Sequence, residues 1–114
     1  MTNVLDKIIE DKKDFLKSIK KTNSLDSIEN TIKSLNNFLN FKEVIAKNKR
    51  ASLITEIKKA SPSAGELVRD FNHLNIAKMY VDNGAACLSV LTEEKHFLGK
   101  LDYIRDIKNK FKIP

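Results

Sequence analysis

The sequence contains a single cysteine, Cys87, so it cannot form a disulfide bond within the chain. Cys87 lies inside the apolar run "AACLSVL", where a small buried core residue is favoured over a reactive thiol. A fold that depends on no disulfide suits a reducing compartment, and we expect a cytoplasmic location.

Long hydrophobic runs are also missing. No apolar stretch approaches the roughly 18 residues that a membrane-spanning helix needs. The opening residues, "MTNVLDKIIEDKKDF", alternate charged with aliphatic side chains, whereas a secretory signal needs an unbroken apolar segment. We expect no membrane partner. With 41% hydrophobic and 32% charged residues, the 114-residue chain is typical of at most one globular domain and too apolar for disorder.

The formal net charge is +6, but the basic residues lack the features of a nucleic-acid interface. The lysines are scattered through every segment, usually beside Asp or Glu, and the densest cluster, "KNKRAS", has no interleaved aromatic residue. We interpret these lysines as parts of solvated helix faces. The hypothesis that the protein binds nucleic acid ranks well below the others. The positive potential would still help to attract a phosphorylated, carboxylated small molecule.

Residues 1–50 are predicted to form a helical N-terminal extension. Ser24 is a plausible N-cap between two helical stretches, and residues 41–49 are predicted to form a short helical turn. The apolar positions at helical spacing are Leu5, Ile8, Ile9, Leu16 and Ile19 in the first stretch and Leu25, Ile28, Ile32, Leu35 and Leu39 in the second.

Residues 51–114 alternate between strand and helix patterns, which indicates βα units with a parallel sheet and places the chain in the α/β class. Two parallel strands do not make a stable sheet by themselves, and the closing "KIP" resembles the approach to another strand. We therefore expect the front part of a larger α/β fold. The predicted order is a strand from Ser52, a loop over 64–73, a helix over 75–84 ending at Gly84, a strand over 85–91 and a helix over 101–111.

The first predicted strand carries an acid and an amine near its end. Because side chains alternate along a strand, Glu56 and Lys58 share one face while Ile57 points to the other. In an eight-stranded βα barrel such an inward-facing pair would lie at the mouth, where reaction sites occur. The carboxylate would orient the ammonium, which would hold an anionic group of a ligand. A surface ion pair on an exposed edge strand explains the same spacing equally well.

The segment "LITEIKKASPSAGELVRDFN" resembles the first strand and loop of indole-3-glycerol phosphate synthase, a (β/α)₈ barrel enzyme of tryptophan biosynthesis. The resemblance continues through "LSVLTEEKHFLG" to the last residue and reaches back to "NVLDKIIEDKKDFL". It implies that residues 51–114 are the first two βα units of such a barrel and that residues 1–50 are the family's N-terminal extension. A whole barrel takes roughly 250 residues, so the resemblance implies an incomplete, truncated barrel.

The family closes 1-(2-carboxyphenylamino)-1-deoxyribulose 5-phosphate into an indole ring with loss of carbon dioxide and water. The reaction is that of a carboxy-lyase and uses no metal or organic cofactor, so the resemblance implies neither. By the E-x-K-x-x-S-P-S pattern, Glu56 and Lys58 match the catalytic pair of the first strand. The resemblance also implies four substrate-binding residues, namely Ser61, Pro62, Ser63 and Phe97, of which the last packs against the substrate's ring.

The resemblance also implies what a barrel of this family needs beyond these residues: a general-acid lysine on the third strand, a glutamate on the fourth and a phosphate grip after the seventh and eighth. We therefore expect the isolated 114-residue chain to lack synthase activity. It would be one piece of a split enzyme with a complementing C-terminal half-barrel, or a partial record or gene remnant. The rival hypothesis is a non-catalytic interaction module, which docks or self-associates through its open sheet edges.

Overall fold

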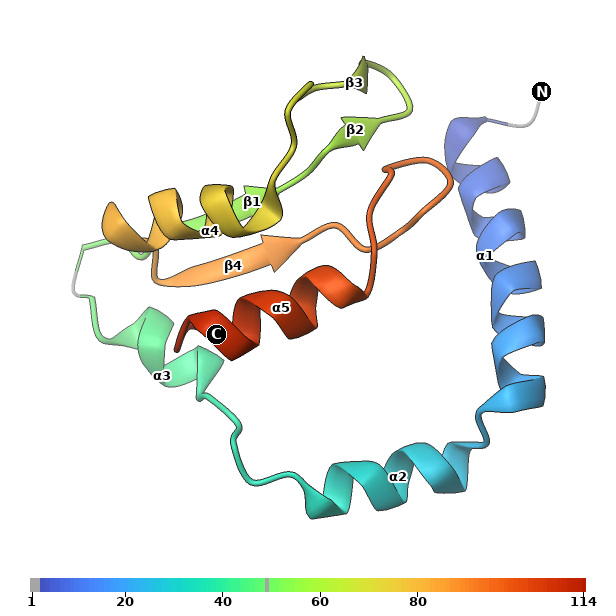
Figure 1. Cartoon of the computed structure of the whole chain (residues 1–114), viewed down its shortest axis with the longest axis horizontal. Coiled ribbons are helices and arrows are strands. Elements are labelled where there is room, and N and C mark those ends of the chain that lie inside the picture. The colour runs from blue at the N-terminus through green and yellow to red at the C-terminus, as the bar shows by residue number, and fades with distance from the viewer. Residues whose placement is uncertain (1–2, 49) are drawn as a thin grey trace. The chain divides into compact units, whose positions relative to one another are not determined.

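The structure, a computed structural model, describes residues 3–48 and 50–114 and divides the chain into two compact units, Met1–Phe38 and Leu39–Pro114 (Figure 1). The first unit contains α1 (Val4–Thr22) and α2 (Leu25–Ser34). In chain order, the second unit contains α3 (Phe41–Ala46), β1 (Ile54–Ile57), β2 (Ala60–Ser61), β3 (Gly65–Glu66), α4 (His73–Asp82), β4 (Cys87–Val90) and α5 (Asp102–Lys110).

Both helices of the first unit begin at capped residues. Asn3 and Asp6 form a reciprocal capping box, and the Ser24 hydroxyl accepts a hydrogen bond from the Ser27 N–H at 3.1 Å, as predicted. The apolar stripe predicted helix as far as Leu39, but α2 ends at Ser34 and Leu35 is extended. The sequence continues with Asn36 and Asn37, which favour turns over helix interiors. Within α1 and α2, all of whose residues are described, no residue is buried.

The core of the second unit lies between one face of a parallel strand pair and two helices. β1 and β4 pair in parallel with Ile54 opposite Cys87, and α4 and α5 pack together against the face that carries Ile57. Ile57, Ala77 and Ile107 form the centre of this core and are each at most 3% exposed. The predicted α/β class, with a parallel pair of strands and a helix after each, is thus confirmed. Cys87 is fully buried, as its apolar surroundings predicted.

The backbone of the last residues lies beside β4. Leu91 donates its N–H to the Ile57 carbonyl of β1 at 3.0 Å, whereas Leu88 donates to the Pro114 carbonyl at 2.9 Å. These two residues are an odd number of positions apart, so their N–H groups point to opposite edges of the strand. The segment after α5 therefore occupies the edge of β4 opposite β1, and a further strand after "KIP" stays a prediction.

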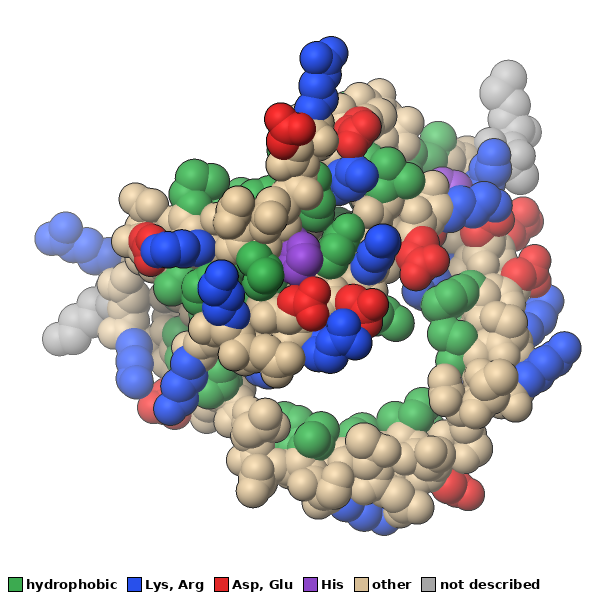
Figure 2. All heavy atoms as spheres, viewed as in Figure 1, with side chains coloured by type: hydrophobic (Ala, Val, Ile, Leu, Met, Phe, Trp, Pro, Cys, Tyr) green, Lys and Arg blue, Asp and Glu red, His purple; other side chains and the backbone are tan. Residues whose placement is uncertain are grey.

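The segment after β1 has more order than the predicted loop. β2 and β3 form a short antiparallel ladder with Ser61 opposite Gly65. Gly65 has φ +68°, a left-handed conformation that glycine adopts without strain, and it allows the chain to reverse within a few residues. On the face of the second unit visible in Figure 2, acidic and basic side chains are interspersed. Among the described residues, no helix has the length and apolarity needed to cross a membrane.

Candidate active site at the carboxyl ends of the strands

Glu56 and Lys58 form an ion pair at the end of β1. The Lys58 Nζ lies 2.8 Å from a Glu56 carboxylate oxygen, and the two side chains are 34% and 47% exposed, respectively. Burial alternates along the strand, with Glu56 exposed and Ile57 buried, because the Ile57 face carries the helices. The structure thus brings the predicted acid and amine together on the face opposite the core.

Neighbouring groups complete this face. Ser89 of β4 is in register with Glu56 and is also exposed, so a hydroxyl-bearing residue lies beside the acid on the adjacent strand. The Tyr80 hydroxyl of α4 donates a hydrogen bond to the Glu56 backbone carbonyl at 3.2 Å, which ties the end of β1 to the helix. Glu56 and Ser89 are therefore neighbouring exposed polar residues on two rigid strands. The same exposure is compatible with a surface ion pair, so the catalytic role of the pair stays a prediction.

The predicted substrate loop begins at Ser61, four residues after the last residue of β1. The Ser61 hydroxyl accepts a hydrogen bond from the Ala64 N–H at 3.2 Å, so the loop closes on itself around Pro62 and Ser63. Ser61 is partly buried, while Pro62 and Ser63 are exposed. The Ser61 oxygen retains its own O–H as a donor, and the Ser63 side chain faces solvent. Both hydroxyls are therefore available to a ligand.

Phe97 lies in the loop that follows β4 and is partly buried. Because β1 and β4 are parallel, their carboxyl ends meet at one edge of the sheet, and the loops that carry Ser61 and Phe97 leave from that same edge. This loop is held by Glu93, whose carboxylate accepts hydrogen bonds from the N–H groups of Lys95, His96 and Phe97. Glu93 was not among the predicted site residues, because no pattern in the sequence shows which backbone amides its carboxylate binds.

A cavity of about 300 Å³ opens among the same loops. Its lining residues are Lys59, Glu94, Leu98, Gly99, Lys100 and Tyr103. None of the predicted site residues lines it, although Lys59 directly follows Lys58 and Leu98 directly follows Phe97. The structure therefore places the predicted residues around one edge of the sheet and does not gather all of them in this cavity.

The two histidines make contacts that stabilise the fold. His73, the last residue of the predicted 64–73 loop, is the first residue of α4, and its Nε2 lies 3.1 Å from an Asp106 carboxylate oxygen of α5. Its ring also stacks on Tyr103 with 4.3 Å between the centroids. His96 contributes its backbone N–H to the Glu93 carboxylate. Neither contact points to a catalytic histidine.

Comparison with known proteins gives the family. Residues 5–114 match the family model described as indole-3-glycerol phosphate synthase. Indole-3-glycerol phosphate synthase of Desulforamulus reducens is 40% identical over 111 residues, which cover 97% of this chain and 42% of that protein. The protein of the same name from Clostridium acetobutylicum is 46% identical over 106 residues, which cover 92% of this chain and 40% of that protein. The chain belongs to the indole-3-glycerol phosphate synthase family.

The part of the chain that matches the indole-3-glycerol phosphate synthase family contains the whole candidate site. The matched residues, 5–114, include Glu56, Lys58, the Ser61–Ser63 loop and Phe97. The chain spans about two fifths of the length of the synthases from D. reducens and C. acetobutylicum. All the residues of the candidate site are therefore among those that the family model matches.

Proposed function

We propose that this chain provides the first part of the active site of an indole-3-glycerol phosphate synthase. In this proposal residues 51–114 are the first two βα units of a (β/α)₈ barrel and residues 1–50 are a helical extension. The parallel β1–β4 pair, with a helix after each strand, supports the arrangement. The observation that carries the proposal is the Glu56–Lys58 ion pair at the carboxyl end of β1, within a chain matched by the family over residues 5–114.

The proposed reaction is the ring closure of 1-(2-carboxyphenylamino)-1-deoxyribulose 5-phosphate to indole-3-glycerol phosphate. Closure attacks a ketone carbonyl, so a cation near its oxygen stabilises the developing negative charge. Lys58 would hold an anionic group of the substrate and take part in acid catalysis. Glu56, 2.8 Å away, would keep the ammonium oriented and support proton transfer. An ion pair exposed to this extent adds little stability, so its removal should test the catalytic role without unfolding the protein.

The remaining contacts would position the substrate. The Ser61 and Ser63 hydroxyls offer hydrogen bonds at the strand edge, Pro62 stiffens their loop, and Phe97 offers an aromatic face to the substrate's ring. The reaction would use no cofactor. A cytoplasmic location fits the free, buried thiol of Cys87.

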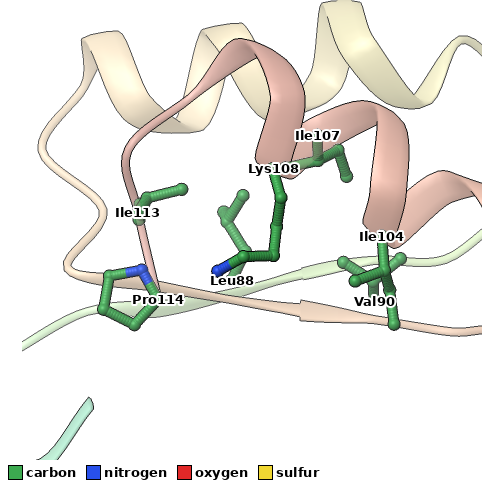
Figure 3. Close-up of a pocket in the computed structure, with 7 residues that line it drawn as sticks. All are labelled: Leu88, Val90, Ile104, Ile107, Lys108, Ile113 and Pro114. Carbon is green, nitrogen blue, oxygen red and sulfur yellow. The ribbon is translucent and has the colours of Figure 1, made fainter. Parts of the chain in front are cut away.

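Activity in this proposal requires the other βα units, supplied by a complementing polypeptide or by further sequence. Two features support such a partner. The edge of β4 opposite β1 already accepts the backbone at Pro114, and beside it lies an apolar groove of about 130 Å³ (Figure 3). Its lining residues are Leu88, Val90, Ile104, Ile107, Lys108, Ile113 and Pro114. The same groove favours the second candidate function, a non-catalytic module that binds another protein through it.

A hybrid enzyme tests the proposal. The matched part of the C. acetobutylicum synthase is replaced by this chain, and indole-3-glycerol phosphate formation is measured. We expect turnover by the hybrid and none by the isolated chain. Lys58→Met should lower kcat/KM at least about a hundredfold, the lower range for loss of an acid–base group. It should change the unfolding free energy by less than about 1 kcal/mol, as for other exposed ion pairs.

The matched control is Lys78→Met on α4, which removes another exposed, ion-paired lysine outside the candidate site. Its kcat/KM should equal that of the hybrid. A folded hybrid without turnover, or equal turnover in Lys58→Met and Lys78→Met, would contradict the catalytic role and leave the interaction module as the better account.

A further inference from the structure

We propose that Glu93 is a positioning residue of the synthase reaction, which sets the conformation of the loop after β4 and thereby the place of Phe97. The inference rests on the proposed function, because the contact between Phe97 and the substrate is part of that proposal. Glu93 itself would touch neither the substrate nor the reacting atoms, since its carboxylate is occupied by its own loop.

The Glu93 carboxylate accepts hydrogen bonds from three consecutive backbone N–H groups. One oxygen accepts from Lys95 at 3.0 Å, and the other accepts from His96 at 2.7 Å and from Phe97 at 3.1 Å. Hydrogen bonds to an ionised acceptor are stronger than neutral ones, and Glu93 is only partly exposed. The carboxylate therefore acts as a hub for the loop, and its third bond is made to Phe97 itself.

The backbone of the same loop is closed at its far end. The Gly99 N–H donates to the Glu93 carbonyl at 2.8 Å, so one residue binds the loop through both its side chain and its backbone. Leu98, between Phe97 and Gly99, has φ 52°, a left-handed conformation that is uncommon for a leucine. A strained residue persists where its surroundings over-determine the backbone, and such residues cluster at ligand sites.

These contacts explain how the loop can hold an aromatic side chain in a fixed direction. Phe97 has a hydrogen-bonded N–H on one side and a left-handed residue on the other, so its Cα–Cβ direction is set by the loop. Binding through a ring contact depends on such fixed geometry, because a loop that must first be ordered reduces the free energy of binding. Loss of the Glu93 carboxylate should consequently weaken substrate binding through Phe97.

The first experiment measures amide hydrogen exchange in the full 114-residue chain. Glu93→Gln keeps the shape of the side chain but removes its charge and one acceptor oxygen. We expect exchange at Lys95, His96 and Phe97 to accelerate about tenfold or more, as for the loss of a hydrogen bond to a charged group. Glu94→Gln, the matched control, makes the same charge change at the exposed neighbouring residue and should leave these amides unchanged. Equal exchange in both variants would overturn the proposal.

The second experiment measures kcat and KM in the hybrid enzyme. Glu93→Gln should raise KM about tenfold with a smaller change in kcat, because a contact made equally to substrate and transition state affects KM. Phe97→Leu should raise KM too, and Glu93→Gln should add little in that background. Fully additive effects, or an unchanged KM in Glu93→Gln, would overturn the positioning role. An inactive parent hybrid would instead count against the proposed function, while the exchange measurement still decides whether Glu93 holds the loop.

Discussion

At the scale of single residues, Glu56 and Lys58 depend on the two-residue repeat of a strand. Their spacing puts both charges on one face, and Ile57 between them fixes which face that is, because its side chain lies in the core. A shift by one residue would bury the charges and expose the isoleucine. Packing of one apolar residue thus determines the orientation of both proposed catalytic groups.

Cys87 permits a prediction about reactivity. Burial raises the pKa of the Cys87 thiol above its ordinary value of 9.0, and only the thiolate is a good nucleophile. We expect an aromatic disulfide reagent to label the folded chain at about pH 8 much more slowly than the denatured chain. Ser63→Cys provides the matched control, since that exposed position should label rapidly in the folded state. Comparable labelling of Cys87 in the folded and denatured states would contradict burial.

The same shift makes stability depend on pH at the alkaline end. The folded-state pKa of Cys87 lies above the unfolded-state value, so the unfolded chain releases its proton first as the pH rises. The stability linked to this thiol is fully present below pH 9.0 and is lost as the pH rises through the folded-state pKa. Urea unfolding at a series of alkaline pH values should show this decrease in wild type, and Cys87→Ala should lack that component.

At the scale of elements, local patterns predicted those parts of the fold that local physics determines. Ser24 predicted the start of α2 because the cap is a short-range hydrogen bond. The end of α2 was not predicted, because the apolar stripe continues to Leu39 while the backbone leaves the helix at Leu35. The β2–β3 ladder was missed as well, since pairs of two residues leave too little periodicity to detect.

The candidate site also contains some residues that local patterns predicted and others that they did not. Glu56 and Lys58 were predicted to lie together because strand alternation is a local rule, and the structure brings their side chains into contact. Glu93 was missed because its function is to bind backbone amides, and a sequence does not show which amides lack a partner. The close approach at Gly99 also depends on where the loop returns to the strand, which no pattern along the chain reveals.

Gly99 gives the prediction for the loop. A Cβ at this position would collide with the Leu91 carbonyl oxygen and would lie 2.9 Å from the Thr92 carbonyl carbon, both of which are backbone atoms that cannot easily move aside. We expect Gly99→Ala to lower the unfolding free energy by about 1–3 kcal/mol, the usual cost of overpacking. Urea unfolding followed by circular dichroism measures this change.

Lys100→Ala is the control for Gly99→Ala, because it alters the next residue of the same loop at an exposed side chain. Its unfolding free energy should stay within about 0.5 kcal/mol of wild type. If Gly99→Ala were equally neutral, the loop would not approach the Leu91 backbone as closely as described, and the rigid presentation of Phe97 would lose support.

At the scale of the whole molecule, the two units differ in how much apolar surface they bury. In the second unit Ile57, Ala77 and Ile107 are buried between the strands and the helices. In the first unit most of the apolar residues of α1 and α2 stay exposed, with Leu5 at 61% and Leu25 at 69%. Amphipathic helices gain most of their stability from packing of the apolar face. The second unit is therefore expected to contain the most stable core of the chain.

The groove between β4, α5 and the final residues is an apolar surface of the second unit. It is lined by Leu88, Val90 and Ile113, and Ile104 stands at its wall with 41% of its surface exposed (Figure 3). Its position beside the edge of β4 joins an apolar face to a strand edge, and both features promote association between chains. Whether this surface is covered should then decide the assembly state of the isolated chain.

We expect the isolated chain to self-associate as its concentration rises, and Ile104→Glu to shift this association to higher concentration because a carboxylate in the groove opposes apolar contact. Sedimentation equilibrium over a range of concentrations measures both. Met79→Glu is the matched control, because Met79 is also exposed, at 55%, but lies on α4 outside the groove. In the hybrid enzyme, where the groove would be covered, Ile104→Glu should instead destabilise the folded state. A wild-type chain that stays monomeric at every concentration, or equal effects of the two substitutions, would show that the groove does not drive association.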